Sequence, residues 1–433
     1  MRHAFAALLL FASTPVAAAS TAVALKNATV WTVAKDAPEK ATIVIQDGKI
    51  VAVGPDVKIP SGATVLDLTG RQVTPGFIDV HSHMGVYPWP GVEANSDGNE
   101  ATDPITPQVR ALDSFWFEDP ALYRASAGGI TAIQVLPGSA NLIGGQAAHF
   151  KVKPGKTLDD MIFKGVPRVM KMALGENPKR VYGERKQMPS TRMGNIALLR
   201  ETFTKAREYK KKWDDFAKKP KADQEKDGPP DKDLKMEALA GILSGEIHPH
   251  VHCYRQDEIL RIFDVAQEFG FKIAALHHCL EGYKVAKEIA SHGAGVATWP
   301  DWYGFKVEAF DGNPWAYRIL LDRGVVAAIK SDSADTVQRF NLEAAKTLRY
   351  GLTEAEAMRL ITLNPAKLLA VDARVGTIEA GKDADLVVFD GSPFSTFSHV
   401  EMTFVDGEVA YRRSPGARHE RSGLEATFFP GLM

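Results

Sequence analysis

Residues Pro75-Gly-Phe-Ile-Asp-Val-His-Ser-His83 form a short apolar run that ends in two histidines separated by one residue. In a β-strand, residues i and i+2 point to the same face, so His81 and His83 are predicted to project side by side at a strand end. Two imidazoles in this arrangement can hold one metal ion, because histidine nitrogen suits zinc and related metals. Taken alone, the pattern fits two ordinary histidines near a strand terminus equally well.

The composition is that of a globular protein with a large core. The chain has 433 residues, of which 45% are hydrophobic and 24% charged. The formal net charge of −1 gives no electrostatic case for binding nucleic acid or an anionic membrane surface. Cys253 and Cys279 each follow a histidine directly, and we interpret them as small buried residues rather than as a disulfide framework.

Residues 1–19 are predicted to be a signal peptide and not part of the fold. Arg2 and His3 precede an apolar run from Ala4 to Ala12, and small residues then lead to an A-x-A-like cleavage site after Ala19. The apolar run is too short to span a bilayer as a mature helix. We therefore expect a periplasmic or secreted protein without stable membrane insertion, the alternative being an uncleaved N-terminal anchor.

The rest of the chain divides into zones. Residues 20–74 read as short β-branched strands, with Asp47-Gly48 as a hairpin signal, and strands return over residues 371–415. We expect the two flanks to form one small composite β-domain, followed by a C-terminal tail at residues 416–433. Over residues 75–370, strand-like runs alternate with helical stretches. That alternation predicts an α/β fold built on a TIM-like (β/α)8 barrel.

One region interrupts the alternation. Residues 198–235 begin as a Lys-rich helical pattern and continue as a polar, proline-bearing stretch. We predict a solvated surface helix followed by a flexible loop. The functional alternative is a lid or a contact with a partner.

Barrel active sites lie at the carboxyl ends of the strands, so ligand-type residues are expected where apolar runs stop. Beyond the first histidine pair, four runs end in this way, at His252, His278, Asp332 and Glu176. In the run that precedes Glu176, strand parity separates Lys171 from the apolar Met170 and Met172, which should face the helices. Lys171 is therefore predicted to point into the barrel.

Together these segments resemble the metal-dependent amidohydrolase superfamily, and most closely its imidazolonepropionase-related branch. The resemblance covers nearly all of the mature chain. It is carried by the segments Val73–His83, Lys171–Asn177, His252–Glu258, His278–Glu281, Ser331–Ser333, Leu363–Ala366 and Gly376–Phe389.

The resemblance implies a role for each matching residue. His81, His83, His252 and His278 would be ligands of one or two divalent metal ions, with zinc the expected metal. Asp332 would touch metal and act as the general base toward a water molecule. A bridging ligand from the fourth strand is also implied, either a carboxylated Lys171 or Glu176. A lone lysine inside a barrel is costly unless it is modified or paired, which favours Lys171, but both alternatives stay open.

Three residues are candidates for contact with a small-molecule substrate. Tyr254 and Arg255 follow the His252 strand end, and Arg255 suits a substrate carboxylate or, equally, a salt bridge to Asp257 or Glu258. Trp302 lies in an aromatic-rich segment that would line a pocket or pack a long loop.

The resemblance implies hydrolysis of a C–N bond in an amide, a cyclic amide or a dipeptide. A mononuclear deaminase or ring-opening hydrolase is the first alternative, and a non-catalytic barrel that binds a ligand is the second. The oligomeric state stays open, with a homo-oligomer among the alternatives.

Overall fold

The computed structural model describes residues 22–414. The expected signal peptide and C-terminal tail fall on residues 1–21 and 415–433 and lie outside the described residues. Strands and helices are mixed throughout the described chain, which confirms the α/β class. No helix within residues 22–414 combines the length and the apolar character needed to cross a membrane.

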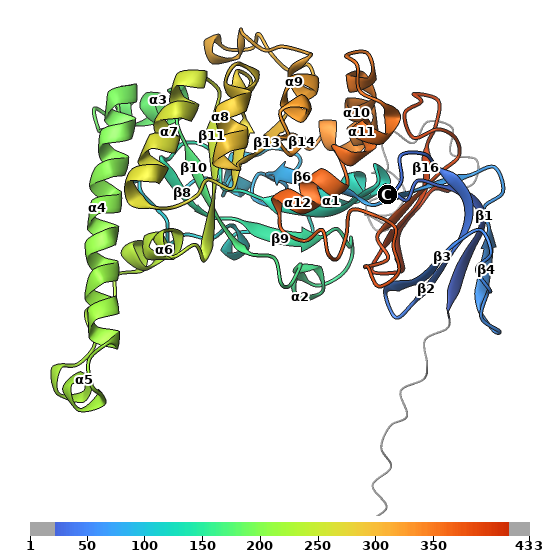
Figure 1. Ribbon diagram of the computed structural model, residues 1–433, viewed down its shortest axis with the longest axis horizontal. Helices are drawn as coiled ribbons and strands as arrows, with labels where there is room; N and C mark the ends of the chain where they lie inside the picture. Colours follow the sequence, from blue (N-terminus) through green and yellow to red (C-terminus); the bar gives the residue numbers. More distant parts are fainter. Residues whose placement is uncertain (1–21, 415–433) are drawn as a thin grey trace, which may run out of the picture.

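The two flanks of the chain meet in one eight-stranded sheet (Figure 1). Its strand order is β17-β16-β15-β5-β1-β2-β3, with β4 paired to β1. The N-terminal members are β1 (Val23–Val30), β2 (Glu39–Gln46), β3 (Lys49–Gly54), β4 (Thr64–Asp67) and β5 (Gln72–Pro75). The C-terminal members are β15 (Leu386–Phe389), β16 (Val400–Val405) and β17 (Glu408–Arg412). Asp47 and Gly48 both have positive φ and connect β2 to β3, as the hairpin signal predicted.

Two further sheets occupy the centre of the molecule. The smaller has the order β6-β7-β9, with β6 (Phe77–Ser82), β7 (Ile130–Val135) and β9 (Ala148–Lys151). The larger has the order β14-β13-β12-β11-β10-β8. Its strands are β8 (Ile143–Gln146), β10 (Arg168–Ala173), β11 (Ile247–Cys253), β12 (Ala275–His278), β13 (Gly295–Thr298) and β14 (Ala327–Ile329).

The central strands run parallel except at one place. β6 pairs in parallel with β7, and β10 through β14 pair in parallel in sequence order. The segment 143–151 runs the other way, because β8 is antiparallel to β10 and β9 is antiparallel to β7. The expectation of simple βα alternation is therefore wrong over this segment, which joins the edges of both central sheets.

Most helices follow the central strands, and α7 to α10 lie together on one side of the sheets (Figure 1). The helices are α1 (Pro120–Ala127), α2 (Leu158–Met161), α3 (Glu176–Glu184), α4 (Arg192–Ala217), α5 (Lys221–Asp227), α6 (Leu234–Leu243), α7 (Gln256–Phe269), α8 (Ala286–His292), α9 (Ala316–Asp322), α10 (Phe340–Leu348), α11 (Glu354–Arg359) and α12 (Leu363–Leu368). Helix α7 shows why these segments become helices. It buries Ile259, Ile262, Phe263 and Ala266, spaced three and four residues apart, and ends at Gly270 with a left-handed φ of 78°.

The Lys-rich region forms an arm that extends from one end of the molecule (Figure 1). Helix α4 begins at Arg192, six residues before the start predicted from the sequence, and runs to Ala217. The predicted flexible loop is wrong in part, because α5 occupies residues 221–227 at the tip of the arm. Pro220 stands at the N-cap of α5, and the residues that follow are mostly good helix formers.

A buried lysine joins the central sheets to the flanking sheet. The ammonium of Lys151, at the end of β9, lies 3.0 Å from Asp383, 2.6 Å from Asp385 and 2.9 Å from Asp406. The Lys151 side chain is 3% exposed. The three carboxylates raise the pKa of Lys151 against the opposing effect of burial, so this residue is charged and bound on three sides.

Replacing Lys151 by methionine is expected to destabilise the protein by about 3–5 kcal/mol, because Asp385 would stay buried without its counter-charge, whereas Asp383 would keep its ion pairs with Lys49 and Arg374. The shift in the urea unfolding midpoint measures this. Lys153→Met is the matched control, since Lys153 contacts only Asp406 among these carboxylates, and its loss should cost at most about 1 kcal/mol. Equal shifts for the two variants would contradict a structural role for the Lys151 cluster.

Candidate metal centre

The ends of four central strands bring ligand-type side chains to one place. His81 is in β6 and His83 just beyond it, His252 is in β11, His278 ends β12, and Asp332 follows β14. The carboxylate of Asp332 lies at the centre. Its Oδ1 is 3.1 Å from His83 Nε2 and 3.5 Å from His81 Nε2, and its Oδ2 is 3.7 Å from His278 Nδ1.

The remaining distances complete the cluster. One ligand atom from each of His81, His278 and Asp332 lies within 4.8 Å of the other two. The His252 ring centroid is 4.2 Å from that of His278. The structure thus brings together five of the six residues that the sequence singled out at the strand ends, and Glu176 is the exception.

The backbone is strained where two of these side chains enter the cluster. His278 has a φ of 68° and Asp332 a φ of 55°, both in the left-handed region that residues with a Cβ rarely adopt. Such conformations cost about 1–3 kcal/mol each and persist only where the surroundings impose them. Here they turn the ends of β12 and β14 so that both side chains reach the centre.

The ring nitrogens of His252 and His278 provide a test of metal binding. All four are buried, and none has a hydrogen-bond partner within residues 22–414. Buried polar atoms almost always have partners, so four such atoms in adjacent rings form an unusual group. Imidazole nitrogen beside a carboxylate is a donor set that suits zinc and similar divalent cations. The residues therefore fit a metal ion.

His83 has the hydrogen bond that orients a metal-binding histidine. Its Nδ1 lies 2.8 Å from the backbone carbonyl of Leu136, which can only accept, so Nδ1 donates. In the neutral ring, Nε2 then carries a lone pair directed toward the cluster. Asp79 supports the neighbouring strand end, because its buried carboxylate accepts from the backbone N–H groups of His81 and Ser331. Burial raises the pKa of Asp79 to about 6.

Two fully buried lysines flank the cluster. Lys171 Nζ lies 3.5 Å from His81 Nε2, and Lys330 Nζ lies 3.0 Å from Asp332 Oδ2. Burial lowers the pKa of Lys171 to about 7 and that of Lys330 to about 8, against the attraction of Asp332 in both cases. Burial disfavours the ionised form of Asp332, but Lys330 and His83 outweigh it and hold the pKa of this carboxyl well below its usual range.

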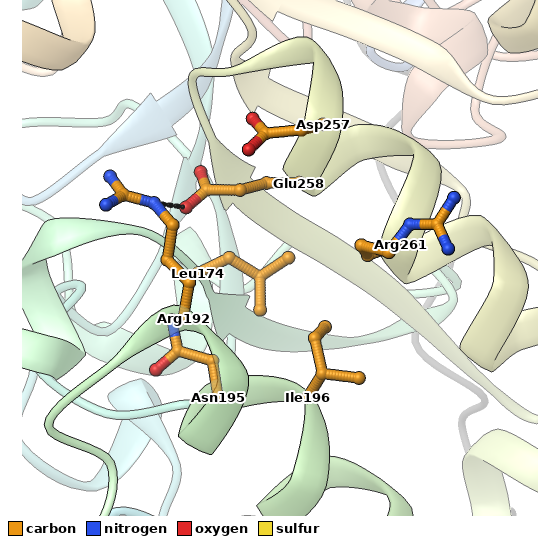
Figure 2. Close-up of a pocket in the computed structure, with 7 residues that line it drawn as sticks. All are labelled: Leu174, Arg192, Asn195, Ile196, Asp257, Glu258 and Arg261. Atoms are coloured by element: carbon orange, nitrogen blue, oxygen red, sulfur yellow. Dashed lines mark hydrogen bonds and ion pairs between the residues drawn. The ribbon is translucent and has the colours of Figure 1, made fainter.

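Glu176 lies in a different set of contacts. It is the first residue of α3, where its N–H donates to Glu308 Oε1 at 2.7 Å, and its carboxylate is 3.5 Å from Lys306 Nζ. Arg192 also forms an ion pair with Glu308. The Nε atom of Arg192 lies 2.7 Å from Glu258 Oε1, and both residues line a pocket of about 50 Å³ (Figure 2). Burial and the neighbouring Glu308 raise the pKa of Glu258 to about 7.

The three candidate substrate contacts differ in position. Tyr254 is 3% exposed, and its ring stacks on that of His278 with centroids 4.9 Å apart. Trp302 is 39% exposed and stacks on Trp299. Arg255 binds Asp257 with both ends of its guanidinium, at 2.9 and 2.8 Å, which is the salt bridge considered from the sequence.

No role for Lys330 was predicted from the sequence, and Trp299 was included only as part of the aromatic-rich segment that contains Trp302. The Lys330 ammonium lies 3.4 Å from the centre of the Trp299 ring, and that ring is 4.9 Å from the His278 ring. Lys330 precedes Asp332 by two residues, so strand parity could have placed both side chains on one face. Trp299 follows the end of β13 directly, which is a second available signal.

Comparison with known proteins shows which family the chain resembles. The amidohydrolase family profile matches residues 286–410. The crystal structure of an amidohydrolase from Thermotoga maritima superposes with a TM-score of 0.83 at 41% identity, and the match covers 90% of this chain and 100% of that one.

Two curated relatives are also similar to this chain. Compared with the Thermotoga maritima protein, one is covered over a smaller share of its length and the other is less identical. Amidohydrolase tasK of Hapsidospora irregularis is 35% identical over 390 residues, which is 85% of this chain but only 40% of that protein. This chain therefore spans less than half the length of tasK. The imidazolonepropionase of Mesorhizobium japonicum is 26% identical over 402 residues, covering 81% of this chain and 87% of that protein. With a solved relative matched over its full length, this chain belongs to the amidohydrolase family, whose members are hydrolases that act on carbon–nitrogen bonds.

Proposed function

We propose that the protein is an exported, metal-dependent amidohydrolase that hydrolyses an amide, a cyclic amide or a dipeptide. The observation that carries the proposal is the convergence of His81, His83 and His278 on the carboxylate of Asp332, with the His252 ring against that of His278. Export rests on the signal-peptide pattern of residues 1–19.

We further infer that the two central sheets form one barrel with eight strand positions. The segment 143–151 would fill the third position in the reverse direction, because β9 pairs with β7 and β8 with β10. At the opposite edge, the N–H of Asp332 donates to the carbonyl of His81 at 3.0 Å and links the ends of β14 and β6. In such a barrel the cluster lies at the carboxyl end of the strands, where barrel enzymes have their active sites.

The donors for the metal would be His81, His83, His252, His278 and Asp332, with zinc as the proposed ion. When bound, such an ion polarises a substrate carbonyl and makes water more acidic. Asp332 is ionised at neutral pH and 21% exposed, so its carboxylate can accept a proton from the attacking water. The same oxygen then returns the proton to the leaving nitrogen as the C–N bond breaks.

Lys171 is the better candidate for a ligand shared between two metal ions. Its amine is fully buried beside His81, whereas Glu176 lies at the start of α3 near Lys306. An amine with a pKa near 7 is in part neutral, and only the neutral amine attacks CO₂. The product is a carbamate, which forms with release of a proton and offers two oxygens that share one negative charge.

The alternative is a mononuclear deaminase or ring-opening hydrolase. An unmodified Lys171 favours it, because a second cation beside this ammonium would meet like charge. A non-catalytic barrel that binds a ligand is the less favoured alternative, since every proposed donor and Asp332 are in place.

The aromatic side chains beside the cluster are proposed to hold the apolar part of the substrate. Tyr254 and Trp299 both contact the His278 ring, and Trp302 continues this surface toward solvent. The charge of Arg255 is bound by Asp257, so we favour Tyr254 and Trp302 as contacts.

Metal analysis of the purified protein, with a screen of dipeptides, N-acyl amino acids and cyclic amides, tests the proposed function. About two metal equivalents together with hydrolysis would support the binuclear enzyme. About one equivalent with release of ammonia would favour the deaminase, and a metal-free, inactive protein would favour the ligand-binding barrel.

Asp332→Asn is expected to lower turnover by roughly 10²–10⁴-fold, because the amide keeps the shape of the side chain but cannot accept a proton near neutral pH. Metal content should be retained, since the four histidines remain. Asp335→Asn is the matched control, as Asp335 is exposed only three residues away and should leave turnover unchanged. Full activity of Asp332→Asn with unchanged metal content would remove Asp332 from the mechanism.

Lys171→Ala is expected to lose one metal equivalent, whereas Glu176→Gln should keep both, because only Lys171 lies against the cluster. Short carboxylic acids in the buffer should restore part of the Lys171→Ala activity by supplying the missing oxygens. Metal counts of the two variants measure the difference. A Lys171→Ala protein that retains two metal ions would refute the carbamate.

A further inference from the structure

We propose that Gln134, His250 and His277 are positioning residues that fix the proton of His81 on Nδ1 through a chain of hydrogen bonds. His81 Nε2 is thereby left with its lone pair facing the proposed metal. The inference rests on the proposed function, because it assigns these side chains to the orientation of one metal ligand.

The chain begins at a group whose role is fixed. The backbone carbonyl of Val80 can only accept, and Gln134 Nε2 lies 2.8 Å from it, so the amide nitrogen must face Val80. On its other side, Gln134 Oε1 lies 2.9 Å from His149 Nε2, which can donate to it. Both contacts give the Gln134 amide the same orientation.

The second proton of that amide sets the state of His250. Gln134 Nε2 is 3.1 Å from His250 Nδ1, so this ring nitrogen accepts and carries no proton. His277 Nε2 lies 2.9 Å from the same nitrogen and donates to it as well, so two N–H groups share the single lone pair of His250 Nδ1. The proton of the neutral His250 ring is then on Nε2, which is buried without a partner within residues 22–414. In a neutral ring only one nitrogen carries a proton, so Nδ1 of His277 accepts. Both rings are fully buried, which keeps them neutral.

The last step reaches the metal ligand. His81 Nδ1 lies 2.9 Å from His277 Nδ1 and donates to it. The single ring proton of neutral His81 is therefore on Nδ1, and Nε2 keeps its lone pair. That nitrogen is 3.5 Å from both Lys171 Nζ and Asp332 Oδ1, on the side of the ligand cluster.

His83 and His81 thus reach the same state by different routes. For His83, a single backbone carbonyl, that of Leu136, receives the Nδ1 proton. For His81, the carbonyl of Val80 acts through three buried side chains on β7, β11 and β12. A change in Gln134, which does not touch the ligand cluster, should therefore alter metal binding.

The proton positions can be measured in the intact metal-loaded protein by ¹⁵N NMR with labelled histidine, with signals assigned through single histidine variants. We expect His277 and His250 both to carry their proton on Nε2. A proton on Nδ1 of either ring would overturn the proposal. Because this measurement uses the native chain, it does not depend on the folding of any variant.

Gln134→Glu tests the consequence for the metal. A carboxyl group has no second donor, so His250 Nδ1 loses the donor on residue 134 and can itself donate. The direction of each hydrogen bond from His250 to His81 is then reversed, and the His81 proton moves to Nε2. We expect Zn²⁺ affinity, measured by competition with a chelator, to fall by roughly 10–100-fold. Gln146→Glu is the matched control, since Gln146 is also buried and donates to the carbonyl of Pro107, and it should leave Zn²⁺ affinity unchanged.

Unchanged Zn²⁺ affinity of Gln134→Glu, or an equal loss in both variants, would overturn the inference. Failure of the proposed function gives a different result, because the unmodified protein would then bind no Zn²⁺ at all.

Discussion

The structure depends on the cost of removing ionisable side chains from water. Around Asp332, three histidines and two lysines are buried, and His83 is half-buried, in a volume that provides few hydrogen-bond partners. A buried charge or an unpartnered ring nitrogen costs free energy. Here the Asp332 carboxylate and the contact of the Lys330 ammonium with the Trp299 ring offset part of that cost. The strained backbone at two strand ends adds to it. The histidine nitrogens without partners are the part of this cost that a cation can relieve.

The same constraint separates the roles of similar residues. Lys171 and Lys151 are both buried, but Lys151 has three carboxylates around it and stays charged, whereas Lys171 shares one with Lys330 and has a pKa near 7. Lys151 holds the sheets together, and we propose a chemical role for Lys171. Neither role follows from the residue type alone, because the number of carboxylates around each ammonium determines whether the lysine stays charged.

Local rules predicted much of this from the sequence. Alternation along a strand placed Lys171 on the inner face, and the ends of apolar runs located His81, His83, His252, His278 and Asp332. The α/β class followed from the alternation of strand-like runs with helical stretches over residues 75–370. The reversed segment 143–151 could not be predicted in this way, because its direction depends on which strand edges are left open, and short apolar runs read alike in both directions. Helix α5 was missed because its polar, proline-flanked sequence also fits a loop. The hydrogen bonds from Gln134 to His81 connect residues far apart in the chain, beyond the reach of any local pattern.

The flanking sheet has a consequence for the order in which the protein can be completed during synthesis. Strand β5 lies between β1, made early, and β15, made near the end of the chain. The partners of Lys151 at positions 383, 385 and 406 are also late, so its charge has no partner among them while the central strands emerge from the ribosome. Contacts between distant segments form slowly, because the chain loses conformational entropy in closing a long loop before the contact contributes stabilising free energy. The nascent chain therefore stays open at this joint until its last strands arrive. A truncation before residue 383 would remove β15, β16 and β17 from the sheet and leave Lys151 without its charge partners.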